Sequence, residues 1–239
     1  MQLEIEIFKF ITVLRQAFFE NKYLNKTVNV PIGRSCHSTI HLKYFNLRKC
    51  SYPMDWIVPF RNEENFEQRI NWLINGFDRF FDLKDIEIQT DGTIVNNFSR
   101  LRFPHEHIIE INQDLRGVLG KYKRRAMRLM KNLEKAKNIN LFYMQNTFDQ
   151  INSTNQTLDD ALIKTSMELL RKHYPNKKIN LFIFEHNSQI EKGDFIKKVV
   201  VEFENIKAIR FISNHCYEKE HNKCILSIYN IMKNELKLI

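Results

Sequence analysis

The chain has 239 residues, of which 43% are hydrophobic, so it is long enough for one large α/β domain and is not disordered throughout. Six Gly and five Pro leave little material for flexible linkers. The net charge of +9, from 37 basic and 28 acidic residues, suits an anionic substrate, a membrane surface, a nucleic acid or a lysine-rich solvated surface, and does not choose among them.

The cysteines and the N-terminus bear on the cellular compartment. Four cysteines without a C-x-x-C pair do not make a disulfide scaffold. Residues 1–14 are interrupted by Glu4, Glu6 and Lys9, and no apolar run reaches the roughly 18 residues of a membrane span. We therefore expect a cytoplasmic protein with free thiols and no transmembrane segment.

The first 26 residues predict a helical extension. Apolar residues recur every three or four positions in an amphipathic pattern, although residues 3–7 also alternate like a strand. The stripe consists of Leu3, Ile7, Phe10, Leu14 and Phe18. We expect this extension to pack on a single α/β domain that spans residues 27–239.

A strand, a tight turn and a helix follow, over residues 28–32, 33–36 and 37–45. Gly33 is expected to adopt backbone angles that a side chain would forbid. Cys36 lies at the helix entry, where unpaired N–H groups and the helix dipole stabilise a thiolate. The same N–H groups could hold an oxyanion during acyl transfer. A buried structural cysteine is the alternative.

The middle of the chain predicts helices over residues 62–75 and 112–137, separated by a hairpin. Residues 86–95 alternate around Asp91-Gly92, a combination typical of a β-hairpin. Residues 102–107 are expected to form a loop, because Pro104 opposes helix or central strand.

The C-terminal half alternates short apolar strands with helices. Strands are predicted over residues 139–144, 179–184, 199–203 and 208–212, and helices over 158–172 and 218–236. This order predicts a three-layer α/β fold with a largely parallel central sheet and helices on both faces. The carboxyl ends of parallel strands bind ligands in such folds. The polar residues that follow the predicted strands are Gln145, Asn146, Glu185, His186, Asn214 and His215.

A thiolate nucleophile needs a base, usually a histidine. His105 and His107 flank Glu106 in the predicted loop, and loops often carry catalytic groups. His186 and His215 are alternative bases at strand ends. The residues His215, Cys216, His221 and Cys224 match no familiar zinc spacing, so we expect neither a metal nor a cofactor.

The long predicted helix carries a basic face that could bind phosphates or an acidic glycan, or could simply be solvated. Aromatic residues do not alternate with its charges, so we expect no nucleic-acid partner. Of Arg124 and Arg125, only one can turn inward toward Cys36, because they lie one residue out of phase with the apolar stripe.

Three separated segments resemble the opening signature of a bacterial family of papain-like cysteine peptidases. That family shows a Gly-x-x-Cys turn, a Leu-Arg pair and a Ser-x-Pro-Phe-Asp-Trp block. Here these are Gly33 to Cys36, Leu47-Arg48 and residues 51–56, with Met54 in place of the usual Phe. Residues 103–106, 122–125 and 141–143 resemble its later elements.

The resemblance implies that Cys36 is the nucleophile, His105 its partner and Asp55 the third group. Because Met54 and Trp56 flank it, Asp55 is also expected to be buried and to contact a histidine, an arginine such as Arg48, or backbone N–H groups. Arg34, Ser35, Trp56, Glu106, His107 and Arg125 are the expected substrate-binding residues. We expect hydrolysis or acyl transfer through an acyl-thioester on a peptide or glycan, including an anionic one, in the surface-polysaccharide setting that the family suggests. The alternative is a non-catalytic module in which the Arg34 turn binds an anionic glycan or phosphate at the helix N-terminus.

Overall fold

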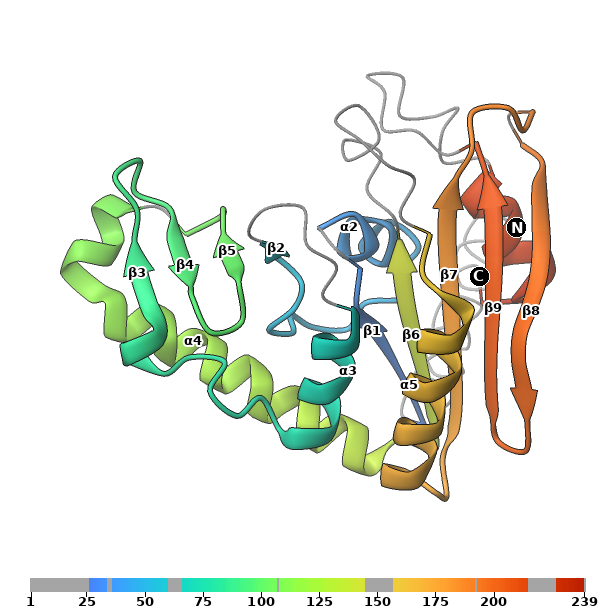
Figure 1. The fold of residues 1–239 in the computed structure, drawn as a ribbon, viewed down its shortest axis with the longest axis horizontal. Coiled ribbons are helices and arrows are strands. Elements are labelled where there is room, and N and C mark those ends of the chain that lie inside the picture. The colour runs from blue at the N-terminus through green and yellow to red at the C-terminus, as the bar shows by residue number, and fades with distance from the viewer. Residues whose placement is uncertain are drawn as a thin grey trace, which may run out of the picture.

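The computed structural model describes residues 26–33, 36–59, 66–106, 108–144, 157–191, 193–214 and 227–238, which form two β-sheets and the helices around them (Figure 1). The larger sheet has the order β1-β6-β7-β9-β8. Its strands are β1 (Thr27–Pro31), β6 (Asn138–Met144), β7 (Lys178–His186), β9 (Ile206–Ser213) and β8 (Phe195–Phe203). The smaller sheet has the order β2-β5-β4-β3. Its strands are β2 (Val58–Pro59), β5 (Leu101–Phe103), β4 (Ile94–Asn96) and β3 (Ile86–Ile88).

The larger sheet is mostly parallel, as the alternation of strands and helices predicted. β1, β6, β7 and β9 run parallel, with Val30 opposite Leu141 and Leu141 opposite Leu181. The last connection differs from the expected pattern, because β8 and β9 form an antiparallel hairpin. Only residues 204 and 205 join them, with φ of Glu204 at 49°, and a parallel crossover needs a dozen or more residues.

The smaller sheet is antiparallel throughout and contains the predicted hairpin. β3 pairs with β4 around Asp91-Gly92, as the sequence indicated. The prediction of a loop over residues 102–107 was partly wrong, because Arg102 and Phe103 belong to β5. Leu101 and Phe103 are buried while Arg102 between them is exposed, the alternation of a strand with one covered face. Pro104 lies in the turn immediately after β5.

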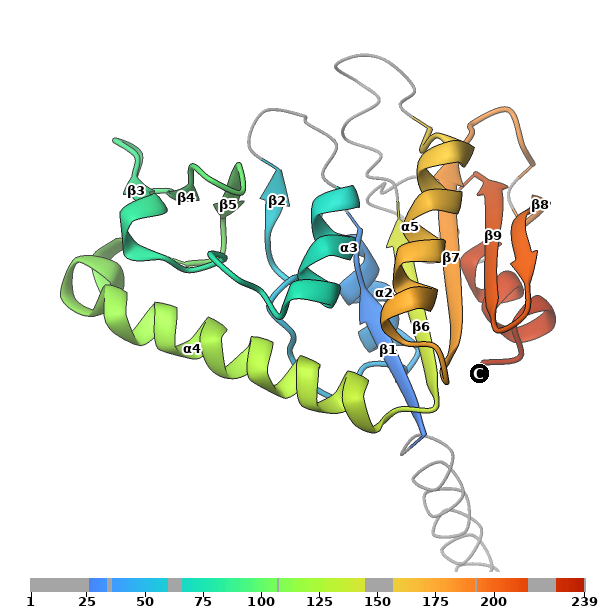
Figure 2. The same cartoon turned by 60° about the horizontal axis from the view of Figure 1, so that its bottom comes forward.

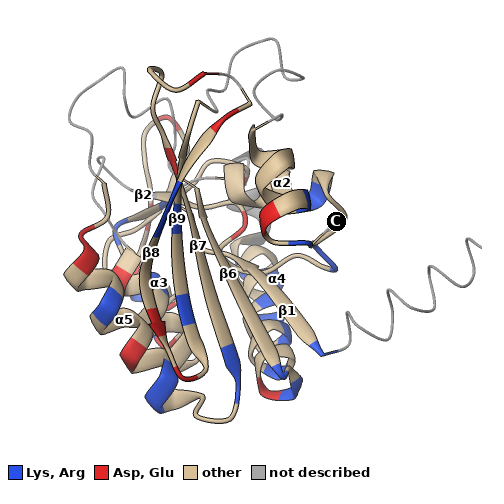
Figure 3. Ribbon diagram, turned by 90° about the vertical axis from the view of Figure 1, so that its right-hand side faces the viewer, with Lys and Arg blue, Asp and Glu red and all other residues tan. Residues whose placement is uncertain are grey.

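Helices contact both faces of the larger sheet (Figures 1 and 3). One apolar cluster joins β1, β6, β7 and β9 to α3 (Phe66–Asn75) and α5 (Asp160–His173), and also includes side chains of the smaller sheet. A second cluster joins the opposite face to α2 (His37–Tyr44) and to residues 227–235, which are helical and end in a π-helical segment, Ile231–Glu235. Whether the whole chain forms three complete layers stays a prediction.

The longest helix, α4 (Ile108–Lys135), begins four residues earlier than predicted and runs beneath the smaller sheet toward the start of β6 (Figure 2). The predicted N-terminal extension, apart from residue 26, and residues 218–226 of the predicted last helix lie outside the described residues. No helix in the described part of the chain is long and apolar enough to cross a membrane.

Candidate functional site

Cys36 lies where the sequence placed it, at the entrance of α2 just beyond the end of β1. Its carbonyl accepts the first helical hydrogen bond, from the N–H of Ile40 at 2.9 Å, and its side chain makes no capping bond. The residue is half-buried. The thiol is therefore held at the first turn of α2, where it could act as a nucleophile next to backbone N–H groups that serve as oxyanion donors.

Position 33 requires glycine because neighbouring atoms leave no room for a Cβ atom, and not because of its backbone angles. A Cβ atom there would lie 2.2 Å from Ser38 Oγ and 3.0 Å from both the backbone N and O of Met144. Ser38 Oγ accepts a hydrogen bond from the Met144 N–H at 3.1 Å, which ties α2 to the end of β6. The φ angle of Gly33 is not in the left-handed region, so the predicted reason for glycine was wrong. Close approach of two chain segments is the actual reason.

The environment of the Cys36 thiol differs from the expectation of a stabilised thiolate. Burial raises the pKa of the thiol above its ordinary value, and a hydrogen bond with its own backbone N–H offsets only part of this rise. Desolvation disfavours the charged form of any acid, and here it outweighs the backbone hydrogen bond. A nearby imidazole or another cation would act in the opposite direction and favour the thiolate.

Asp55 is fully buried and contacts an arginine, as predicted. Its Oδ2 accepts hydrogen bonds from Arg48, including one from Nε at 3.0 Å, and from the backbone N–H of Tyr52 at 2.9 Å. Arg48 also donates to Ser51 Oγ at 2.8 Å. Burial raises the pKa of Asp55, and the charges of Arg48 and Arg125 partly lower it again. All recorded hydrogen bonds of the Asp55 carboxylate among the described residues thus go to Arg48 and Tyr52, and none to a histidine.

Trp56 connects the helix of Cys36 to His105. Thr39, in the first turn of α2, donates its hydroxyl to the carbonyl of Asp55 at 3.0 Å. The next residue, Trp56, packs edge-on against the His105 ring, with the two centroids 5.0 Å apart. Trp56 is half-buried and His105 is exposed. The α2 entrance, Trp56 and His105 therefore lie in one neighbourhood, although Cys36 and His105 are 69 positions apart in the sequence.

Glu106 and Arg125 belong to a polar cluster beside this neighbourhood. Glu106 forms an ion pair of 2.5 Å with Lys121 of α4. Burial, followed by the charge of Glu106, raises the pKa of Tyr122. The Arg125 guanidinium lies 5.0 Å from the centre of the Tyr122 ring.

The two arginines of α4 face different ways, as the phase of the helix predicted. Arg125 is half-buried and its charge acts on Asp55, whereas Arg124 is exposed. Contact between Arg125 and Cys36 stays a prediction.

The alternative base His186 is half-buried at the end of β7. Its neighbour Glu185 is buried and forms an ion pair of 3.3 Å with Arg210, so this strand-end carboxylate is already occupied. Sequence analysis did not predict this pair. Charged residues within otherwise apolar strands, such as Arg210 in β9, were the available signal.

Several candidates lie outside the described residues. They are Arg34, Ser35, His107, Gln145, Asn146, His215, Cys216, His221 and Cys224. Within the described ranges, no group of three or more His, Cys, Asp or Glu residues is arranged to hold a metal ion.

The comparison with known families agrees with the resemblance that the segments around Cys36 and Asp55 indicated. Residues 27–188 match the family described as "Putative papain-like cysteine peptidase (DUF1796)", and this range covers more than half of the chain. The chain belongs to this family. No curated protein and no solved structure matches the chain.

Proposed function

We propose that the chain is a cysteine peptidase in which Cys36 is the nucleophile and His105 its base. The observation that carries the proposal is the position of Cys36. Its uncapped, half-buried thiol lies at the entrance of α2, in the same neighbourhood as the Trp56–His105 contact. The family description supplies the peptide as substrate class.

The reaction would proceed through an acyl-thioester. The Cys36 thiol gives its proton to the imidazole, and the sulfur forms a bond to the scissile carbonyl carbon, whose oxygen becomes an oxyanion held by backbone N–H groups of α2. Collapse breaks the C–N bond, and the imidazolium protonates the departing amine. Water, deprotonated by the imidazole, then attacks the thioester and releases the acid and the free thiol.

The base must counteract burial, because burial raises the pKa of the Cys36 thiol. An imidazole that pairs with the thiolate lowers the pH at which the sulfur becomes reactive. His105 ranks first because it lies in the part of the chain that matches the family and contacts Trp56. His186 and His215 are the competing candidates.

The remaining proposed site residues surround this pair. Trp56, Glu106 and Arg125 are the described candidates for substrate contact. Asp55 would act indirectly, because its hydrogen bonds hold the turn that carries Trp56, and Trp56 in turn supports His105. Transfer of the acyl group to a glycan acceptor, as in surface-polysaccharide metabolism, would share the first half-reaction and differ only in its product.

The pH dependence of Cys36 alkylation tests the proposal. With iodoacetamide and peptide mass spectrometry, we expect Cys36 to react at pH 6–7 faster than the half-buried Cys50, since the thiolate is the reactive form. His105→Ala should move the Cys36 profile upward by one or more pH units, to that of a buried thiol, whereas His186→Ala and His215→Ala should leave it unchanged.

Two outcomes contradict the assignment. If the alkylation of wild-type Cys36 already has the pH dependence of a buried thiol, then Cys36 and a histidine do not form a catalytic pair. A shift produced by His186→Ala or His215→Ala, and not by His105→Ala, assigns the base to a strand end instead. Cleavage of a peptide library by the wild type and its absence in Cys36→Ala separates a peptidase from a module that only binds anions.

A further inference from the structure

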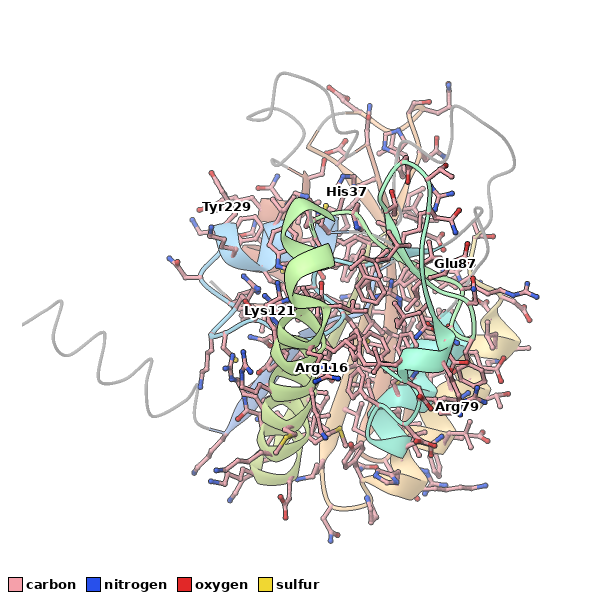
Figure 4. All side chains as sticks on the ribbon, turned by 90° about the vertical axis from the view of Figure 1, so that its left-hand side faces the viewer. His37, Arg79, Glu87, Arg116, Lys121 and Tyr229 are labelled. Carbon is pink, nitrogen blue, oxygen red and sulfur yellow. The ribbon has the colours of Figure 1, made fainter. Side chains whose placement is uncertain are left out.

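A groove lies along α4 between this helix, the turn of residues 76–82 and the end of α5. Its volume is about 1320 Å³, above the roughly 300–1,000 Å³ typical of small-ligand pockets. Neither Cys36 nor His105 lines it. Figure 4 shows α4 beside the segment that carries Arg79, on the side where the groove runs.

The groove combines apolar side chains with a cationic wall. Phe81, Leu119 and Met130 line it and are partly buried, and Met127 is 64% exposed. Lys123, Arg124 and Lys131 line it from α4. Among the described residues no hydrogen bond or ion pair is recorded for any of these three cations.

The sequence of α4 is strongly basic along most of its length. Residues 115–133 contain seven Lys and Arg residues and no Asp or Glu. Arg124 and Arg128 lie four residues apart on α4, so their like charges repel each other along the helix. In Figure 3, the ribbon of α5 is coloured for both basic and acidic residues, whereas the coloured positions visible on α4 are mostly basic. A helix that needed only solubility would gain stability from the mixed charges that α5 has.

The opposite wall has a different charge pattern. Asp78 and Asp82 lie on the turn of residues 76–82, and Asp82 pairs with Lys84 at 2.9 Å. Arg79 pairs with Asp85 at 3.1 Å and covers the Phe98 ring. The cations without a recorded partner among the described residues are therefore on the α4 wall, which also carries Glu134, while Asp78 and Asp82 line the opposite side. A uniform polyanion would meet repulsion from these acids, and a glycan would leave the apolar floor uncovered.

We propose that the α4 groove binds an acidic amphipathic helix of a partner protein. Apolar side chains at helical spacing would fill the floor over Met127, and Glu or Asp side chains on one flank would pair with Lys123, Arg124 and Lys131. This binding is independent of the chemistry at Cys36, so the two proposals can fail separately.

Fluorescence anisotropy with model peptides tests the proposal on the full-length chain. The first probe is a labelled 16-residue amphipathic helix with Leu and Phe on one face and Glu on the flanks. The second carries Lys in place of Glu, and the third keeps Glu but has Ser in place of Leu and Phe. We expect saturable binding of the first peptide only, weakening as salt screens the charges.

Matched variants localise the binding. Lys123→Glu with Arg124→Glu should lower the affinity for the first peptide by about tenfold or more, because like charges now face each other across the interface. Lys164→Glu with Lys172→Glu makes the same charge change on exposed positions of α5 outside the groove and should leave affinity unchanged. Cys36→Ala should also bind as the wild type does.

The following results overturn the proposal. Equal binding of the first and third peptides would show a simple polyanion site. Stronger binding to vesicles of anionic phospholipid than to the first peptide, lost in the groove variant, would assign a membrane surface. Binding that appears only after residues 1–24 are removed would assign the groove to the chain's own N-terminal segment. Failure of the first peptide to bind at 1 mM would remove the docking site altogether.

Discussion

The two sides of α4 use the same residue types in opposite ways. On the side of the candidate site, Lys121 is paired with Glu106, and Arg125 lies over Tyr122 and acts on Asp55. On the groove side, Lys123 and Arg124 are exposed and have no recorded partner among the described residues. Paired charges fix the positions of neighbouring side chains, whereas unpaired charges on a surface are available to a ligand. The same helix thus carries paired charges beside the candidate site and charges without a recorded partner along the proposed docking groove.

The largest effect is expected at the buried pair that supports the site. Arg48→Met leaves the fully buried Asp55 without its guanidinium partner, which should cost about 3–5 kcal/mol of unfolding free energy. Urea denaturation at pH 7 measures this loss. A cost under about 1 kcal/mol would place the pair among weak surface ion pairs and would contradict the comparison.

The loss of unfolding free energy in Arg48→Met should also depend on pH. The folded-state pKa of Asp55 is raised by burial, and removing Arg48 should raise it further. The folded protein then holds the proton more tightly than the unfolded chain does. The stability deficit of Arg48→Met should therefore be smallest below the ordinary carboxyl pKa and grow as the pH rises through the raised one. A deficit that is constant from pH 3 to pH 8 would show that Asp55 does not change charge in this range.

A smaller effect is expected from Gly33→Ala. The new Cβ would lie 2.2 Å from Ser38 Oγ, so the first turn of α2 must shift and the bond from Met144 N–H to Ser38 is lost. We expect a cost of about 1–3 kcal/mol in urea denaturation. Ser38→Ala is the matched control, and the double variant should cost less than the sum of the two single variants because the closest clash is gone. Additive costs would show that the crowding at Gly33 lies elsewhere.

The smallest effect is expected on the groove side, and in the opposite direction. Arg124→Glu replaces a like-charge pair with Arg128 by a Glu-to-Arg pair at i, i+4. Because a repulsion is removed and an attraction of similar size is gained, it should stabilise the protein by about 0.4–1 kcal/mol. Thermal unfolding at low salt measures this, and the gain should shrink at 1 M salt. A destabilisation above about 1 kcal/mol would show that Arg124 has a structural partner like those on the other side of α4.

The sequence alone determined the order of most elements and the family to which the chain belongs. Apolar runs predicted β1, β6, β7 and β9, and the Gly-x-x-Cys turn with the Asp55-Trp56 block pointed to the matched family. These are local signals, because the side-chain period of two or 3.6 residues and the chemistry of a turn are encoded in adjacent positions. Burial of Asp55 beside Arg48 followed in the same way from its hydrophobic neighbours.

Only the tertiary structure decided what depends on distant residues. The need for glycine at position 33 comes from Met144, more than a hundred residues away, and the rise in the Cys36 pKa comes from burial that no local pattern specifies. The contact of Trp56 with His105 and the groove between α4 and residues 76–82 likewise join separate segments. Desolvation and close packing are properties of the assembled chain, since each depends on which atoms exclude water from a given group.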